Sequence, residues 1–84
     1  MDNIHGNRLR GLRKKKGYTQ IKVQMETGID QSDYSKLETG KRYPSFQQAE
    51  QLCRLFDTSI DYIYGITDEP MPYPRSDRVK KFTD

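Results

Sequence analysis

Four side chains with hydrogen-bonding ends gather on one side of a short predicted helix. They are Gln31, Ser32, Ser35 and Lys36. Positions three and four apart share a helix face, so an amide, two hydroxyls and an ammonium are presented together. The packing of so small a chain does not require polar ends at these positions. Such a helix is able to face a partner, and the alternative for Gln31, Ser32 and Lys36 is an ordinary solvated helix face.

Cations gather in two further stretches. Lys41 and Arg42 lie in the turn Gly40–Pro44 that follows this helix, where they are suited to a phosphate backbone. Arg8–Lys16 carries six basic residues and no acidic one. For Lys14–Lys16 two interpretations stand: the lysines complement the negative end of a helix dipole, or they contact phosphates.

The sequence offers little for catalysis or metal binding. The one histidine, His5, lies in a polar N-terminal stretch, where we expect it to be exposed, and Cys53 is expected to be a small core residue. No Cys/His or carboxylate set has the spacing of a metal or acid–base site, so we predict no enzyme, no metal and no cofactor. Nothing indicates a small-molecule ligand either.

The single cysteine cannot form an intramolecular disulfide, which fits a reducing compartment. No window approaches the roughly 18 apolar residues of a membrane span. We therefore expect a soluble, cytoplasmic protein without a membrane partner.

Five short helices are needed to position these side chains. Cap residues and apolar spacing predict a first helix that begins between Asn3 and Asn7 and ends at Lys16, followed by helices Gln20–Thr27, Gln31–Thr39, Phe46–Phe56 and Ile60–Tyr64. Thr19, Asp30, Ser45 and Ser59 are their expected N-caps, and Gly28 makes the turn between the second and third helices. With no strand pattern, the fold class is all-α, a compact bundle.

The apolar positions of these helices predict one shared core. Its expected members are Leu9, Leu12, Val23, Thr27, Ile29, Tyr34, Leu37, Phe46, Ala49, Leu52, Cys53 and Phe56. A chain of 84 residues supports one such core, so we expect one folded domain over residues 1–66. Residues 67–84 contain three prolines and read as a tail that is extended, disordered or folded back over the body.

The whole body resembles a known family. The stretches RLRGLRKKKGYTQ, SKLETGKRYPS and SIDYIYGITD, with a glycine turn between the first two, are similar to the lambda-repressor-like, Cro-type helix-turn-helix family, also called the Xre family. The match covers Arg8–Asp68, and its specificity comes from features aligned across all five helices. The resemblance implies a compact five-helix lambda-repressor-like domain. It also implies a sequence-specific transcriptional regulator, a repressor that binds a two-fold operator in double-stranded DNA as a homodimer.

The resemblance also assigns roles by position. It makes Gln31, Ser32, Ser35 and Lys36 the candidates for contact with base edges in the major groove. It makes Gln20, Lys41 and Arg42 the candidates for phosphate contact. Arg13 and Glu38 match a pair that the family joins in a partly buried salt bridge between the first helix and the recognition helix.

Several residues depart from the family pattern. Gln24 stands where the family usually has alanine, and Thr27 where it usually has leucine. Ile21 and Met25 occupy positions that are usually polar, so they either cover the gap left by Thr27 or form an apolar patch for a partner. That patch, or the tail, supports the alternative of a protein-interaction module of the same fold, such as an antitoxin.

Two acidic side chains also stand at the end of the helix that should meet DNA. We interpret Asp30 as a helix cap. For Asp33 the alternatives are local capping and contact with a cytosine amino group.

Overall fold

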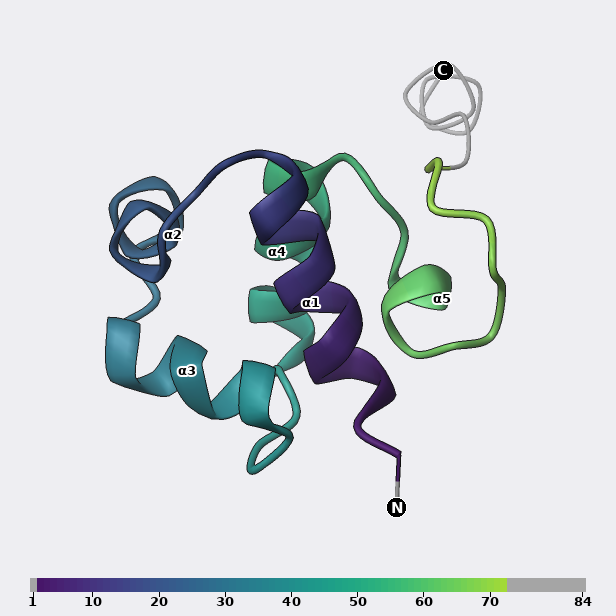
Figure 1. Ribbon diagram of the computed structural model, residues 1–84, viewed down its shortest axis with the longest axis horizontal. Helices are drawn as coiled ribbons and strands as arrows, with labels where there is room; N and C mark the ends of the chain where they lie inside the picture. The colour runs from purple at the N-terminus through teal and green to yellow at the C-terminus, as the bar shows by residue number, and fades with distance from the viewer. Residues whose placement is uncertain (1, 73–84) are drawn as a thin grey trace, which may run out of the picture.

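The computed structural model describes residues 2–72, and these residues form five α-helices joined by short loops (Figure 1). No strand occurs among them. The helices are α1 Ile4–Lys15, α2 Gln20–Thr27, α3 Gln31–Thr39, α4 Phe46–Phe56 and α5 Ile60–Ile63. The predicted all-α class is therefore confirmed. Most of the predicted tail, residues 73–84, lies outside the described residues.

Two helix ends differ by one residue from the sequence prediction. α1 ends at Lys15 rather than Lys16, because Lys16 already caps the helix and Gly17 follows with a left-handed φ of 73°. α5 ends at Ile63 rather than Tyr64, which forms the cap before Gly65. In both places a glycine turns the chain, and the residue before it leaves the helix.

Side-chain caps explain where α2 and α4 begin. Thr19 Oγ1 accepts a hydrogen bond from the Lys22 amide at 3.1 Å at the start of α2. Ser45 and Gln48 form a reciprocal capping box at the start of α4, where each side chain bonds the other residue's backbone amide. Both caps satisfy amides that a helix leaves without an internal partner.

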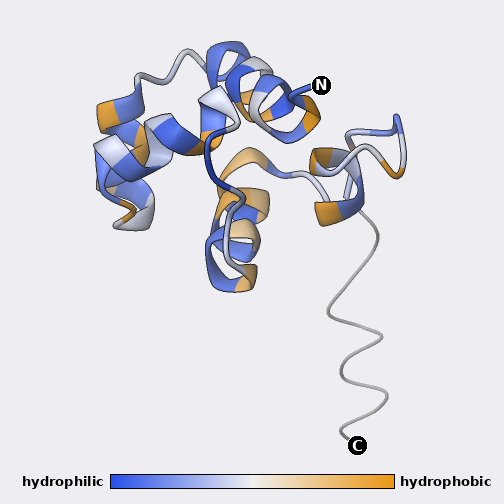
Figure 2. Cartoon of the chain, turned by 90° about the horizontal axis from the view of Figure 1, so that it is seen from below, coloured by the Kyte–Doolittle hydropathy of each residue, from blue (hydrophilic) through white to orange (hydrophobic). Residues whose placement is uncertain are grey.

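Side chains from all five helices build one core. α1 packs against α3 on one side and α5 on the other, while α2 packs against α3 and α4 (Figure 1). Its apolar members are Leu9, Val23, Ile29, Tyr34, Leu37, Ala49, Leu52, Cys53, Phe56 and Ile63. Leu12 and Thr27 were also predicted there and are half-buried. Figure 2 shows that α4 has one hydrophobic and one hydrophilic side, as a helix that covers a core requires.

Phe46 was wrongly assigned to this core. It continues the apolar face of α4, three residues before Ala49, but its side chain is 74% exposed. Phe46 is the first residue of α4, directly after the loop, and none of the described residues covers that tip of the helix. Periodicity therefore gave the correct face of α4, and the position of the helix end decided the exposure of its first residue.

Candidate nucleic-acid interface

The turn between α2 and α3 is held by side chains of both helices. Gly28 takes a left-handed φ of 79°, and Asp30 caps α3 by accepting a hydrogen bond from the Ser32 amide at 3.0 Å. Gln24 Oε1 accepts a hydrogen bond from the Gln31 amide at 2.6 Å. The Thr27 hydroxyl donates to the Val23 carbonyl and accepts from the Ile29 amide. The two departures Gln24 and Thr27 thus replace apolar packing at this turn by hydrogen bonds.

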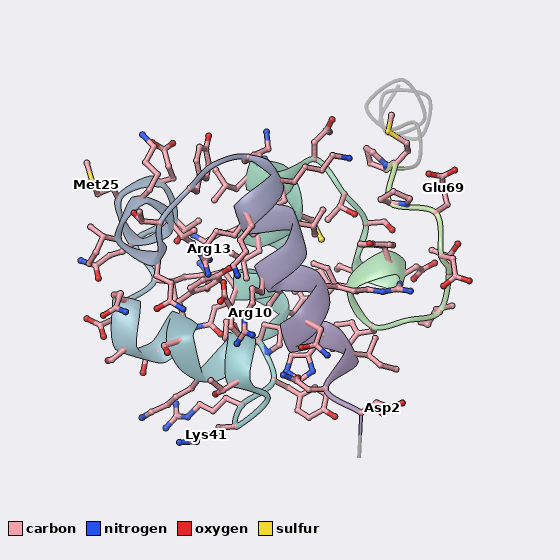
Figure 3. All side chains as sticks on the ribbon, in the orientation of Figure 1. Asp2, Arg10, Arg13, Met25, Lys41 and Glu69 are labelled. Atoms are coloured by element: carbon pink, nitrogen blue, oxygen red, sulfur yellow. The ribbon has the colours of Figure 1, made fainter. Side chains whose placement is uncertain are left out.

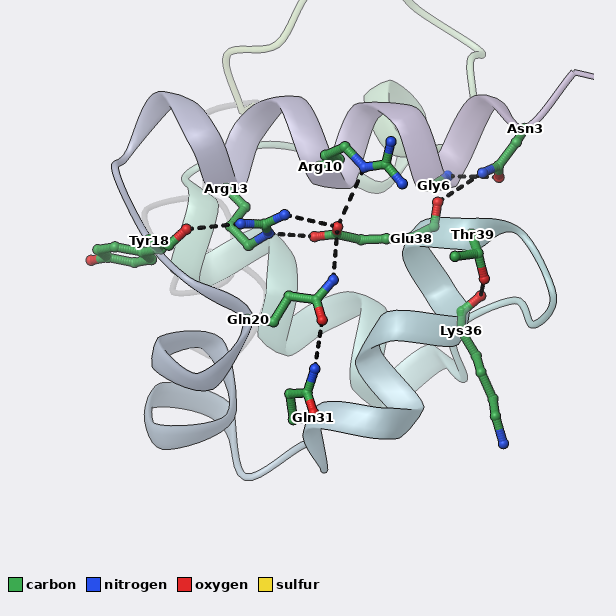
Figure 4. A network of polar contacts seen from close by, with 10 residues as sticks. All are labelled: Asn3, Gly6, Arg10, Arg13, Tyr18, Gln20, Gln31, Lys36, Glu38 and Thr39. Atoms are coloured by element: carbon green, nitrogen blue, oxygen red, sulfur yellow. Dashed lines mark hydrogen bonds and ion pairs between the residues drawn. The ribbon is translucent and has the colours of Figure 1, made fainter.

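The four candidate residues on α3 reach the surface to different degrees. Ser32 and Lys36 are exposed, whereas Gln31 and Ser35 are half-buried. The Ser32 hydroxyl donates to Asp30 Oδ2, and this hydrogen bond lowers the pKa of the Asp30 carboxyl. Among residues 2–72 the Lys36 ammonium has no ion-pair partner, and its side chain extends away from the body (Figure 4).

A chain of amide hydrogen bonds fixes the first residue of α3. Gln31 Nε2 donates to Gln20 Oε1 at 2.7 Å, and Gln20 Nε2 donates to Glu38 Oε1 at 3.2 Å (Figure 4). Gln31 is therefore held at two points: Gln24 binds its backbone amide, and Gln20 binds its side chain. Gln20, a candidate for phosphate contact, therefore also positions a candidate for base contact.

Glu38 is the centre of this network and is almost completely buried. Arg13 from α1 forms a bidentate pair with it, with Nε 2.6 Å from Oε2 and Nη2 3.0 Å from Oε1. Arg10 Nε lies 3.6 Å from Oε1. Burial by itself raises the pKa of Glu38, but the hydrogen bonds from Arg13 and Gln20 outweigh burial and hold the pKa below its usual value. The structure thus brings Arg13 and Glu38 together as a buried ion pair that ties α1 to α3.

The loop after α3 presents two cations to solvent. Lys41 and Arg42 are both exposed, and within the described chain neither forms an ion pair. Gly40 ends α3 with a φ of 82°, and the Arg42 amide donates to the Lys36 carbonyl at 3.2 Å. Figure 3 shows Lys41 pointing away from the body at the end of α3.

His5 corrects a sequence prediction. We expected it to be exposed, but only 5% of it is exposed. Its Nε2 lies 2.9 Å from the Arg42 carbonyl oxygen, and its ring stacks on Tyr43 with 4.3 Å between ring centroids. The residue is buried because the first turn of α1 packs against the loop after α3. Nothing in the polar sequence around His5 indicated this contact.

Asn3 and Gly6 were also missed from the sequence. The Asn3 side chain caps α1 and donates from Nδ2 to the Glu38 carbonyl at 2.8 Å. A Cβ on Gly6 would collide with the same oxygen, so the two helices approach more closely than any other residue type allows. The sequence signal that could have indicated this close approach was a glycine in the first turn of a predicted helix.

The remaining basic residues of Arg8–Lys16 divide into two groups. Arg8 donates to the Tyr62 carbonyl in α5, and to the Thr67 carbonyl and Asp68 Oδ1 after α5, so its donors are used within the chain. The Lys14–Lys16 run is exposed, so the structure leaves both of its interpretations open.

Ile21 and Met25 lie on the outer side of α2. They are 53% and 72% exposed, so they do not cover a gap at Thr27, and that interpretation is wrong. Figure 3 shows Met25 directed to solvent. The two side chains form a small exposed apolar patch.

Neither a membrane span nor a metal-binding cluster is found in the described part of the chain. None of its helices has the length and apolar character needed to cross a membrane. Residues 2–72 also contain no group of three or more His, Cys, Asp or Glu side chains that could hold a metal ion.

Comparison with known proteins identifies the family. The chain is 36% identical over 81 residues to the uncharacterized HTH-type transcriptional regulator YobD of Bacillus subtilis, covering 96% of this chain and 72% of YobD. It is 34% identical to the HTH-type transcriptional regulator AnsR of the same organism, covering 83% of this chain and 60% of AnsR. An uncharacterized HTH-type transcriptional regulator of Archaeoglobus fulgidus is 31% identical, with 76% of this chain and 91% of that protein covered.

No solved structure matches the chain significantly. A family model described as a helix-turn-helix domain matches residues 6–69, which include all of α2–α5 and most of α1. The chain therefore belongs to the helix-turn-helix domain family, in its Xre-like form.

Proposed function

We propose that this protein is a transcriptional regulator that binds double-stranded DNA with α3 in the major groove. The observation that carries the proposal is the exposed side of α3, whose polar side chains continue directly into the free cations of the following loop. Side chains that read bases and side chains that neutralise phosphates are needed side by side at such an interface. The names of the relatives, all HTH-type transcriptional regulators, support the same function.

Gln31 is the best-supported base-reading residue. One of its two amide protons is used by Gln20, which leaves the second N–H and the carbonyl oxygen for a partner. Adenine presents one acceptor and one donor in the major groove, and glutamine can satisfy both at once. We therefore expect Gln31 to favour adenine. Ser32, Ser35 and Lys36 are the proposed base-facing neighbours further along α3.

Lys41 and Arg42 supply affinity rather than specificity in this proposal. Both are exposed and unpaired among the described residues, so contact with phosphates breaks no ion pair within this part of the protein. Each phosphate contact releases counterions, which favours binding at low salt irrespective of sequence. Gln20 is the third proposed phosphate-contacting residue.

From the family resemblance we further propose that the regulator is a repressor. In this proposal it binds a two-fold operator as a homodimer. Recognition helices related by a two-fold axis enter successive major grooves on one face of the duplex, so half-sites should lie about 10 base pairs apart. Selection of bound sequences from a random duplex library measures this spacing directly. A selected site with a single half-site would contradict the dimer.

The two kinds of contact can be separated in one titration series. Gln31→Ala should relax the preference at one base pair per half-site by about 1 to 3 kcal/mol. Lys41→Ala and Arg42→Ala should weaken binding to all sequences alike, and each should reduce the slope of log affinity against log salt by about one, since each removes one phosphate-binding cation. Gln47→Ala and Arg54→Ala, exposed residues of α4, are the matched controls.

Two outcomes would contradict the assignment. An unchanged sequence preference in Gln31→Ala, together with a defined base change in Lys41→Ala, would place the loop rather than α3 in the groove. Absence of salt-dependent retention on duplex DNA would favour the alternative, a protein-interaction module such as an antitoxin. The exposed Ile21 and Met25 patch is the observation that supports that alternative.

A further inference from the structure

We infer that His5 is a positioning residue for the DNA-contacting loop, and that it acts through the backbone of Arg42. The inference rests on the proposed function, because it assigns His5 to the loop that we expect to contact phosphates. His5 lies in the first turn of α1, outside α3 and the loop themselves. Neither the family resemblance nor the relatives' names assign it a role.

The close approach of α1 and α3 brings His5 to the loop. Gly6 allows the first turn of α1 to touch the last turn of α3 at the Glu38 carbonyl. Asn3 donates to that same carbonyl at 2.8 Å, and a Cβ on Gly40 would lie 2.6 Å from the Asn3 side chain. With Asn3 and Gly6 fixed in this way, His5 between them is directed at the residues that follow Gly40.

His5 contacts the loop in two ways. Its Nε2–H donates to the Arg42 carbonyl at 2.9 Å, and its ring stacks on Tyr43, with an interplanar angle of 29°. The ring is buried, so water does not compete for this hydrogen bond as it would at the surface. The contact fixes the peptide that carries the Arg42 side chain and lies one residue after Lys41.

Other contacts complete the attachment of the loop. The Arg42 amide donates to the Lys36 carbonyl at 3.2 Å, and the Tyr64 hydroxyl donates to the Pro44 carbonyl at 3.3 Å. The bond from His5 is the shortest of the three, and of the three it is the one whose acceptor carbonyl belongs to a loop cation, Arg42. A loop held before binding loses less conformational entropy when its cations meet phosphates, so it binds more tightly.

The experiment uses two substitutions with opposite properties. His5→Phe keeps a ring that can stack on Tyr43 but removes the donor. His5→Gln removes the ring but keeps an amide nitrogen the same number of bonds from the backbone as Nε2. We expect His5→Phe to weaken binding to every duplex sequence by roughly threefold to tenfold, and His5→Gln to stay within about twofold of wild type.

A coupling measurement separates positioning from a general loss of stability. Each substitution is made in the wild-type protein and in the Lys41→Ala/Arg42→Ala protein, and affinity for one duplex is measured where circular dichroism shows all forms folded. The effect of His5→Phe should disappear when both loop cations are absent. Thr58→Val is the matched control, since it removes an equally buried hydrogen bond to a backbone carbonyl, that of Pro70, and should leave affinity unchanged.

Each result decides the inference. An equal loss from His5→Phe with and without the loop cations would overturn it, as would a His5→Gln protein that binds as weakly as His5→Phe. If His5→Phe does not fold, the His5→Gln comparison in the two backgrounds decides, and an equal large loss in both overturns the inference. If the Lys41→Ala/Arg42→Ala protein binds as wild type does, the proposed role of the loop fails instead.

Discussion

The two sides of α1 hold their neighbours by different means. Toward α3, Arg13 is paired with a Glu38 side chain that is 1% exposed. Toward α5, Arg8 binds two backbone carbonyls and an Asp68 side chain that is 97% exposed. Both contacts are made by a guanidinium group, but only Arg13 faces a buried carboxylate. We therefore expect the packing of α1 on α3 to depend on the Arg13 pair, and the packing of α1 on α5 to depend little on the exposed Asp68 carboxylate.

The largest expected effect is the loss of Arg13. Arg13→Met leaves the buried Glu38 without its bidentate partner, at a cost of about 3 kcal/mol in the free energy of unfolding. Arg13→Met combined with Glu38→Gln should cost less than Arg13→Met alone, because no buried charge is then left unpaired. A double-mutant cycle by urea unfolding measures the coupling. Additive costs would remove the distinction between the two sides of α1.

Gly6→Ala tests the close approach on the same side. The new Cβ would meet the Glu38 carbonyl, so we expect a destabilisation of about 1 to 3 kcal/mol. Gly11→Ala in the same helix is the control, since nothing lies within 4 Å of a Cβ at that position. It should stabilise the protein by up to about 1 kcal/mol through helix propensity. Equal thermal midpoints for the two variants would contradict this packing.

Acid should lower the free energy of unfolding by less than these substitutions do. Protonation removes the charge of Glu38, so no unpaired charge is left buried between α1 and α3. The pKa of Glu38 is lower in the folded protein than its usual value of 4.5. Its contribution to stability is therefore complete above that value and is lost as pH falls through the lower folded pKa. Chemical unfolding between about pH 6 and pH 3 should show a shallower decline for Glu38→Gln than for wild type. Parallel profiles would show that this carboxylate is not the linked group.

The smallest effect is expected on the opposite side. We propose that residues up to Glu69 suffice for folding, since every core residue precedes Thr67. A chain ending at Glu69 keeps the Arg8 contacts and loses the bond from Thr58 to the Pro70 carbonyl. The thermal midpoint should fall by less than about 8 °C, which corresponds to roughly 1 kcal/mol. A larger fall would give residues 70–84 a structural role.

Local sequence signals accounted for most of the fold. The bounds of α2, α3 and α4 follow from Thr19, Asp30 and Ser45 as caps and from glycine or the loop at their ends. Caps and periodicity depend on residues a few positions apart, which a single sequence displays. The Arg13 and Glu38 pair was expected only because the family resemblance aligned two residues 25 positions apart.

The features missed from the sequence depend on how the helices and loops are placed in space. His5 is buried by a loop 37 residues away, and Gln24 became a cap for α3 only because the turn folds it back onto Gln31. Phe46 is exposed because it is the first residue of α4 and none of the described residues covers that end of the helix. A polar residue in a polar stretch carries no local sign of burial, so these positions required the three-dimensional arrangement.

The carboxylate of Glu38 gives the chain of amides a direction. An ionised carboxylate only accepts hydrogen bonds, so Gln20 must turn its NH2 group toward Glu38 and its oxygen toward Gln31. Gln31 must then turn its own NH2 group inward, which fixes the order in which its oxygen and nitrogen meet the outside. A neutral amide in place of Glu38 would allow both glutamines to reverse together. A residue that touches no base would in this way set the polarity with which Gln31 reads one.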